Sequence, residues 1–112
     1  MLVVDDELFV RMMAVDAIED AGHVTVEAGN ADEAVDVLEK RSDIDVLFTD
    51  VKMPGSMDGL GLVALSRRRW PNVRVIVTSG HVTLPEMDPD TPFLSKPYRT
   101  RTLTDRIAAV AN

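Results

Sequence analysis

The sequence predicts an α/β fold with one doubly wound, five-stranded parallel sheet and helices on both of its faces. Short runs of β-branched residues alternate with segments of helical periodicity along the chain, which is the pattern of strand–helix–strand units. Two of the runs, residues 2–4 and 46–49, are apolar almost throughout, as strands buried on both faces must be. A chain of 112 residues suffices for one core, so we expect residues 1–112 to form a single domain.

The first predicted helix covers residues 8–21 and follows the first strand. Apolar residues recur in it at intervals of three and four, namely Leu8, Met12, Val15 and Ile18. These side chains share one face, which we expect to pack on the sheet, and Gly22 offers the helix stop. The flexible side chains of Met12, Met13 and Met53 are expected to fill the core rather than to form a binding surface.

The second strand and the second helix are expected between residues 24 and 38. The β-branched run at 24–26 predicts the strand. Asn30 stands directly before a segment of helical periodicity, and Glu33 follows it three residues later. This spacing resembles a capping box with asparagine in place of serine or threonine, so we expect the helix to begin behind Asn30.

The middle of the chain repeats the alternation of strand and helix. A third strand is predicted at 46–49, and a helix at 60–69 is opened by Asp58-Gly59 and closed by Pro71. The β-branched run at 73–78 predicts the fourth strand.

The last third of the chain departs from this regularity. Residues 82–91 contain Pro85 and Pro89, so a helix there is expected to be short or degenerate. A weaker run at 92–95 predicts the fifth strand. The last helix is marked by its apolar spacing at Leu103, Ile107 and Val110.

Composition disfavours several classes of protein. Nineteen acidic against twelve basic residues give a net charge of −7, which disfavours direct binding to nucleic acid. The absence of cysteine excludes disulfides, thiolate zinc sites and cysteine nucleophiles. No apolar run approaches the roughly 18–20 residues that span a bilayer, and no signal-type stretch opens the chain. We therefore expect a cytoplasmic protein that binds neither nucleic acid nor membrane.

Polar side chains follow four of the five predicted strands. They are Asp5 and Asp6 after the first strand, Asp50 after the third, Thr78 at the end of the fourth and Lys96 after the fifth. The carboxyl ends of parallel strands lie along one edge of a sheet, and ligands bind in the crevice at that edge. If these four strands lie close together, the side chains converge.

Such a cluster has a defined chemistry. Three carboxylates repel one another unless a cation joins them, and oxygen ligands without histidine or cysteine suit Mg²⁺. A carboxylate can also act as a nucleophile and form an aspartyl phosphate, whose charge Lys96 and Thr78 would contact. Taken alone, each residue has a simpler interpretation: Asp6 could cap the following helix, and Lys96-Pro97 could be a turn.

Five ordered motifs carry a resemblance to a known family. They are Val3-Val4-Asp5-Asp6-Glu7, Thr49-Asp50-Val51-Lys52-Met53-Pro54, Met57-Asp58-Gly59, Val77-Thr78-Ser79-Gly80 and Leu94-Ser95-Lys96-Pro97. From Leu2 to about Ala111 the sequence resembles the receiver domain of two-component response regulators, the CheY-like family. The resemblance implies a flavodoxin-like sheet of order 2-1-3-4-5, a histidine kinase or a histidine phosphotransfer protein as partner, and a downstream protein target that the sequence does not name.

The resemblance also implies roles for the acids at the sheet edge. Asp50 would accept a phosphoryl group from a phosphohistidine of the partner. Asp6 and Asp50 would bind Mg²⁺ directly, Asp5 would bind it mainly through water, and the backbone carbonyl of Lys52 would be a further ligand. Lys96 would contact the phosphoryl group. The side chain of Lys52 is expected to face solvent.

A second set of residues would form the conformational switch. Thr78 resembles the hydroxyl that moves toward the phosphate, and Phe93 stands where the family has its switch aromatic, although it could equally be a plain core aromatic. Pro97 is the position before which the family commonly has a cis peptide bond. The small Ser79 would leave the acyl phosphate accessible to the donor and to water.

Two departures from the family pattern concern loops and assembly. The loop after Asp50 is one residue longer at Gly55-Ser56 than the commonest pattern, and the interval from Thr78 to Lys96 is short and rich in proline. The family's usual dimerisation face is therefore in doubt, and the oligomeric state stays open. The chain could be a stand-alone regulator or a piece of a longer regulator or hybrid kinase.

Two other classes of protein share features with a receiver. A pseudo-receiver would act only as a protein-binding module, but such domains typically lose the acceptor or the acids, which this chain keeps. Phosphohydrolases of the haloacid dehalogenase type carry an aspartate two residues after their aspartyl nucleophile, where this chain has Lys52. We therefore expect a signalling phosphoacceptor that catalyses only its own phosphorylation and dephosphorylation, and not an enzyme that acts on other substrates.

Overall fold

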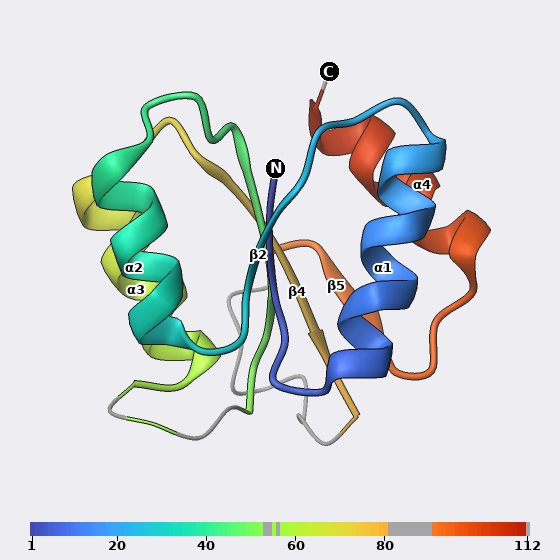
Figure 1. Cartoon of the computed structure of the whole chain (residues 1–112), viewed down its shortest axis with the longest axis horizontal. Helices are drawn as coiled ribbons and strands as arrows, with labels where there is room; N and C mark the ends of the chain where they lie inside the picture. Colours follow the sequence, from blue (N-terminus) through green and yellow to red (C-terminus); the bar gives the residue numbers. More distant parts are fainter. Residues whose placement is uncertain (53–54, 56, 81–90, 112) are drawn as a thin grey trace.

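The computed structural model of the chain describes residues 1–52, 55, 57–80 and 91–111 (Figure 1). Its strands are β1 (Leu2–Val4), β2 (Val26–Ala28), β3 (Val46–Asp50), β4 (Arg74–Ser79) and β5 (Phe93–Ser95). Its helices are α1 (Leu8–Asp20), α2 (Ala31–Lys40), α3 (Gly59–Arg69) and α4 (Thr100–Ala111). Within the described ranges, no helix is long and apolar enough to cross a membrane.

All five strands form one parallel sheet in the order β2-β1-β3-β4-β5. Helices α1 and α4 cover one face of this sheet, and α2 and α3 cover the other (Figure 1). The predicted fold class and the strand order that the resemblance implied are thereby confirmed. The short fourth helix expected at 82–91 falls almost entirely on residues outside the described ranges.

The sheet separates two apolar cores. Side chains of β1 alternate between them, since Leu2 and Val4 lie in the core beneath α2 and α3, whereas Val3 lies in the core beneath α1 and α4. These three residues are at most 1% exposed, which confirms that β1 is buried on both faces. Fully burying a side chain of this size stabilises the fold by about 1.5–3 kcal/mol.

Helix α1 buries only part of the face that its periodicity predicted: Val15 and Ile18 are buried as expected, but Leu8 and Met12 are not. Its buried residues are Ala14, Val15, Ala17 and Ile18. The predicted core residues Leu8 and Met12 are 53% and 48% exposed, and Met13, also predicted to be buried, is 65% exposed. The first half of α1 is apolar on nearly every side, so periodicity alone could not identify the buried face. Met53 lies outside the described residues.

Strand β2 begins two residues later than predicted. The propensity of the run 24–26 favoured an earlier start, but Val24 is 77% exposed. The register with β1 decides the position, because Leu2 pairs with Val26 and Val4 pairs with Ala28. Pairing to a neighbour therefore overrides β-propensity here.

Helices α2 and α3 begin at the predicted capping residues. The Oδ1 atom of Asn30 accepts a hydrogen bond from the amide of Glu33 at 2.8 Å, and the Glu33 carboxylate accepts one from the amide of Gly29 at 3.1 Å. Asp58 accepts a hydrogen bond from the amide of Gly61 at 2.9 Å. Each cap satisfies an amide that has no partner within its own helix.

Candidate functional site

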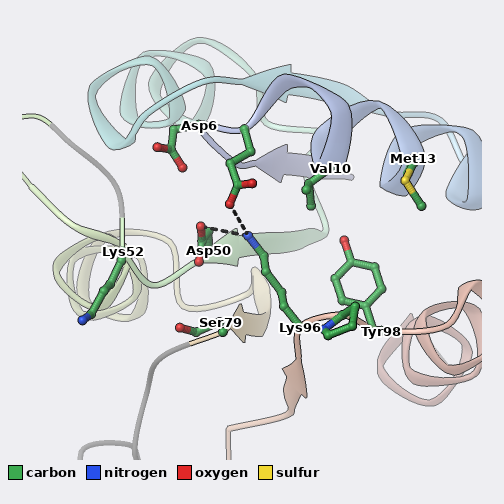
Figure 2. Close-up of a pocket in the computed structure, with 11 residues that line it drawn as sticks. Asp6, Val10, Met13, Asp50, Lys52, Ser79, Lys96 and Tyr98 are labelled. Carbon is green, nitrogen blue, oxygen red and sulfur yellow. Dashed lines mark hydrogen bonds and ion pairs between the residues drawn. The ribbon is translucent and has the colours of Figure 1, made fainter.

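The polar residues predicted to converge do so at the carboxyl edge of the sheet. Asp5 and Asp6 follow β1, Asp50 ends β3 and Lys96 follows β5. Because β3 lies between β1 and β4 in the sheet, Asp50 is central, and it pairs in register with Thr78. Side chains far apart in the sequence therefore meet around Asp50 (Figure 2).

Lys96 forms ion pairs with three carboxylates of this group. Its Nζ atom lies 3.0 Å from Oδ2 of Asp5, 3.1 Å from Oδ2 of Asp50 and 3.5 Å from Oε1 of Glu7. The side chains of Asp5 and Asp50 are nearly buried, whereas Glu7 is exposed. One ammonium group thus offsets the charge of two buried acids. The Lys96–Pro97 peptide bond is cis, as the resemblance implied.

Burial and charge act against each other on this cluster. Burial raises the pKa of the Asp50 carboxyl above its usual value, and the hydrogen bond and charge of Lys96 offset only part of that rise. Burial by itself would lower the pKa of Lys96, but hydrogen bonds to Asp5 and Asp50 outweigh it, so the pKa of Lys96 is raised. Lys96 is therefore cationic at neutral pH.

The backbone around Asp50 is fixed by the two neighbouring segments. The amide of Val51 donates to the carbonyl of Thr78 at 3.0 Å, and the amide of Gly59 donates to the carbonyl of Val51 at 2.7 Å. A Cβ atom at Gly59 would lie only 1.8 Å from the carbonyl oxygen of Asp50. The glycine of the Met57-Asp58-Gly59 motif is therefore required by the close approach of α3 to the end of β3.

The acids at this edge form a donor set suited to a hard cation. Oxygen atoms of Asp5, Asp6, Glu7 and Asp50 all lie within 4.8 Å of one another. Asp5 and Asp50 are buried, and Asp6 and Glu7 are exposed. Carboxylate oxygens without nitrogen or sulfur ligands fit Mg²⁺ better than transition metals. Glu7 was not predicted as a member of this group, although it directly follows the two aspartates in the sequence.

Thr78 is a buried residue of β4 that pairs in register with Asp50. It is 2% exposed, and its Oγ1 atom has no hydrogen-bond partner among the described residues. The neighbouring Thr49, in contrast, donates to the carbonyl of Asp50 at 2.9 Å. A buried hydroxyl without a partner costs about 1–3 kcal/mol, so Thr78 retains a hydrogen-bonding capacity that the described residues do not use.

Phe93 lies on the neighbouring strand β5, half-buried beside the core beneath α2 and α3. It pairs in register with Val77, the residue before Thr78. Its carbonyl accepts a hydrogen bond from Arg106 of α4 at 3.1 Å. The predicted switch aromatic is therefore one strand away from the predicted switch hydroxyl.

A cavity of about 590 Å³ opens in front of these groups. Its polar wall contains predicted residues, among them Asp6, Asp50, Ser79 and Lys96. Lys52 also lines the cavity, and its exposed side chain points away from Asp50 and Lys96, as predicted (Figure 2).

The opposite wall of the cavity is apolar, and of its residues only Pro97 was predicted for the site. It is formed by Val10 and Met13 of α1 and by Pro97 and Tyr98. Figure 2 shows Val10, Met13 and Tyr98 on this side of the cavity. Tyr98 packs edge-on against Phe48 with ring centroids 5.9 Å apart. Burial, followed by the charge of Asp5, raises the pKa of Tyr98 to about 12, so its hydroxyl is neutral at physiological pH. The spacing of Val10 and Met13 was the available signal, but it indicated core and surface equally well.

Comparison with known proteins places this geometry among signalling domains. The sequence profile of the response regulator receiver domain matches residues 1–108. Sensor kinase CckA of Brucella abortus is 33% identical over an alignment of 113 positions, which covers 95% of this chain and 12% of that protein. The transcriptional regulator NtrC of Klebsiella pneumoniae is 38% identical over 84 residues, 73% of this chain and 17% of that protein.

Solved structures agree with the sequence relatives. The receiver domain of NtrX from Brucella abortus superposes with a TM-score of 0.88 at 28% identity, covering 97% of this chain and 95% of that one. The receiver domain of the hybrid histidine kinase CckA gives a TM-score of 0.84 at 31% identity, covering 99% and 97%. The chain thus matches whole receiver domains but spans under a fifth of the curated relatives CckA and NtrC.

Proposed function

The chain belongs to the response regulator receiver domain family of two-component signalling, and we propose that Asp50 is its phosphoryl acceptor. The observation that carries the proposal is the position of the Asp50 carboxylate. It is buried at the sheet edge, lines the cavity and lies 3.1 Å from the Lys96 ammonium. The donor would be a phosphohistidine of a histidine kinase or of a histidine phosphotransfer protein.

The proposed step is a displacement at phosphorus. An oxygen of the Asp50 carboxylate forms a bond to phosphorus while the phosphorus–nitrogen bond of the phosphohistidine breaks, and the imidazole leaves with that electron pair. Lys96, which already contacts Asp50 and Asp5, would pair with an oxygen of the transferred group. Ser79 is small and lines the cavity, so it leaves the phosphorus open to the donor and later to water.

The same acids support a Mg²⁺ site. We propose Asp6 and Asp50 as direct ligands, Asp5 as a ligand through water and the Lys52 carbonyl as a further ligand. The oxygen-only donor set within 4.8 Å supports this assignment. When bound, the ion would supply positive charge against the phosphoryl oxygens.

The proposed output is a shift between two conformations. The Thr78 hydroxyl, which has no partner among the described residues, would donate a hydrogen bond to a phosphoryl oxygen on Asp50, the residue with which it pairs in register. Movement of Thr78 would change the packing beside β5 and so bias the position of Phe93.

Exposed apolar side chains beside the cavity support a docking surface for the donor. Leu8, Phe9, Met12 and Met13 at the start of α1 are between 48% and 80% exposed. Met13 also lines the cavity that the donor histidine must enter. Exposed apolar groups of this kind commonly mark protein interfaces. The variant Phe9→Ser should slow transfer from a phosphorylated histidine phosphotransfer protein and leave phosphorylation by acetyl phosphate unchanged.

Intact-mass analysis after incubation with acetyl phosphate tests the acceptor. We expect a gain of one phosphoryl group that requires both Mg²⁺ and Asp50, so that Asp50→Asn shows none. Asp36→Asn, at an exposed position of α2, is the matched control and should be phosphorylated like the wild type.

Two outcomes would contradict the proposal in different ways. Absence of both a phosphoryl adduct and a beryllofluoride complex would leave a pseudo-receiver that only binds proteins. Steady release of phosphate from many phosphate esters would instead indicate a phosphohydrolase.

A further inference from the structure

Arg11 is a partly buried cation close to the site that the proposed chemistry does not use. It is the fourth residue of α1 and closes the first turn of this helix, and its side chain is 18% exposed. Its Nη1 atom donates to the backbone carbonyl of Asp5 at 2.8 Å, and its Nε atom donates to Oε1 of Glu27 in β2 at 3.0 Å. One guanidinium group therefore connects α1, the end of β1 and β2.

The carbonyl that Arg11 binds lies at the start of the acidic loop, which we define as Asp5-Asp6-Glu7. Pairing between β1 and its neighbours ends at Val4, so the peptide groups of the loop need other partners. The amide of Asp5 donates to the carbonyl of Ala28 at 3.2 Å, and its carbonyl is held by Arg11. Arg11 thus fixes the loop where the sheet no longer does.

Inside the loop, a second contact depends on the same backbone position. The Oδ1 atom of Asp5 accepts a hydrogen bond from the amide of Glu7 at 2.9 Å. Oδ2 of the same carboxylate lies 3.0 Å from the ammonium of Lys96. Rotation of the Asp5 peptide would disturb both contacts, so the direction of this carboxylate follows the position of the carbonyl that Arg11 binds.

The surroundings leave little freedom for the guanidinium. A Cβ atom at Gly29, directly after β2, would lie 3.2 Å from Nη1 of Arg11. The absence of a side chain there leaves room for Arg11 to approach the ends of β1 and β2. The planar guanidinium donates in two fixed directions at once, a geometry that the single ammonium of a lysine cannot reproduce.

We propose that Arg11, oriented by Glu27, is a positioning residue that holds the acidic loop in the conformation that gathers its carboxylates around Asp50. Arg11 touches neither the phosphoryl group nor the metal, so it acts through the backbone of Asp5. The consequence for metal binding rests on the proposed function, because it assumes that the loop contributes to a Mg²⁺ site. The consequence for the conformation of the loop does not depend on the proposed function.

The first measurement uses the metal-free protein. Amide hydrogen exchange at Glu7, read by NMR, reports the contact between this amide and Asp5. Arg11→Met keeps the aliphatic stem and removes both donated hydrogen bonds, and we expect exchange at Glu7 to become about tenfold faster. Arg41→Met is the matched control, because Arg41 makes an exposed ion pair with Asp43 away from the loop. It should leave exchange at Glu7 unchanged.

The second measurement is the dissociation constant for Mg²⁺, determined by calorimetry. Loss of a group that orients metal ligands typically weakens metal affinity by about 10- to 100-fold, and we expect a loss near the lower end for Arg11→Met. Arg11→Lys should recover part of the affinity, since it keeps the charge and one donor. Arg41→Met should stay within about twofold of the wild type, as expected for an exposed ion pair.

The outcomes separate the inference from the proposed function. A wild type that binds no Mg²⁺ would contradict the proposed metal site, and the exchange at Glu7 would then decide the role of Arg11 by itself. A wild type that binds Mg²⁺, with Arg11→Met matching Arg41→Met in both measurements, would overturn the inference. If Arg11→Met does not fold, Gly29→Ala serves instead: it should displace Nη1 by a few tenths of an ångström and accelerate exchange at Glu7, and unchanged exchange would overturn the inference.

Discussion

The starts of α1 and α2 differ in their capping: α2 has a side-chain cap and α1 has none. Helix α2 begins behind Asn30, whose side chain accepts a hydrogen bond from the amide of Glu33. Helix α1 begins behind Glu7, whose side chain accepts no hydrogen bond from the helix, although two aspartates stand directly before it. Aspartate is among the best capping residues, so the sequence at α1 offers a cap that the structure does not use.

The difference between the two helix starts shows that the acids before α1 serve the site and do not cap the helix. Oδ1 of Asp5 accepts a hydrogen bond from the amide of Glu7, the residue before the first helical residue. Oδ2 of Asp5 faces the ammonium of Lys96. The acidic loop before α1 thus serves the site rather than the start of the helix. Departures from a local rule are expected where residues serve function.

Removing the cation that these acids face should give the largest effect. Lys96→Met would leave Asp5 and Asp50 nearly buried without their ion-pair partner. Breaking a buried pair in this way costs about 3 kcal/mol, so the midpoint of urea unfolding at pH 7 without Mg²⁺ should fall clearly.

The matched control for Lys96 is Lys40→Met in the last turn of α2, where the side chain is exposed. Its effect should stay within about 0.5 kcal/mol, as for most surface substitutions. Equal losses for the two variants would show that the acids near α1 do not depend on Lys96.

Gly59→Ala should give the next largest effect, because it presses the start of α3 against the site. Its Cβ atom would overlap the carbonyl oxygen of Asp50, which is backbone and cannot rotate away. Overpacking of this kind costs about 2 kcal/mol or more, measurable by urea unfolding.

Gly61→Ala, two residues later, is the comparison for Gly59. Its Cβ atom would meet the side chains of Met57 and Asp58, not the sheet, and alanine favours the helix. A loss at Gly61 as large as that at Gly59 would mean that the helix, and not the contact with Asp50, sets the requirement for glycine.

Much of the fold followed from local patterns. The caps at Asn30 and Asp58 were predictable because a cap is formed by residues three apart in the sequence. The strand order came from the resemblance, not from periodicity. The errors at α1 and β2 share a cause: which face of an all-apolar helix is buried, and where a short strand begins, depend on neighbours distant in the sequence.

The site, like the fold, was predictable only where its residues follow from local sequence and strand direction. Its polar wall was predictable because strand ends of a parallel sheet lie at one edge. Its apolar wall was not, because Val10 and Met13 could belong equally to a core or to a cavity. The role of Arg11 had no local signal, since its partners Asp5 and Glu27 belong to two different strand ends.

The contrast between the helix starts can be measured directly with a pair of substitutions. Asn30→Ala should cost about 1 kcal/mol, because the amide of Glu33 loses its acceptor. Glu7→Ala should cost less than about 0.5 kcal/mol, because no helix amide depends on that side chain. Thermal or urea unfolding in the absence of Mg²⁺ compares the two, and equal losses would contradict the view that α1 starts without a cap.

The smallest expected effect concerns Asp50 and depends on pH. Burial holds the pKa of Asp50 above its usual 3.8, so the folded state prefers the protonated form and its contribution to stability is lost as pH rises through the folded pKa. Asp50→Asn should therefore be more stable than the wild type at pH 7, with a gain that shrinks toward pH 4. The gain is small because Lys96 offsets part of the burial.

The exposed Asp43 provides a comparison of opposite sign. The hydrogen bond from Arg41 lowers the pKa of Asp43, so its contribution is present above the usual 3.8 and is lost as pH falls. Asp43→Asn should thus be slightly less stable than the wild type at pH 7 and equal to it well below pH 3.8, as urea unfolding at pH 7 and at about pH 2 without Mg²⁺ can show. A loss of stability at pH 7 for Asp50→Asn as well would mean that the ion pair with Lys96 outweighs burial. The acids of the sheet edge would then stabilise the metal-free fold much as the cap at Asn30 does.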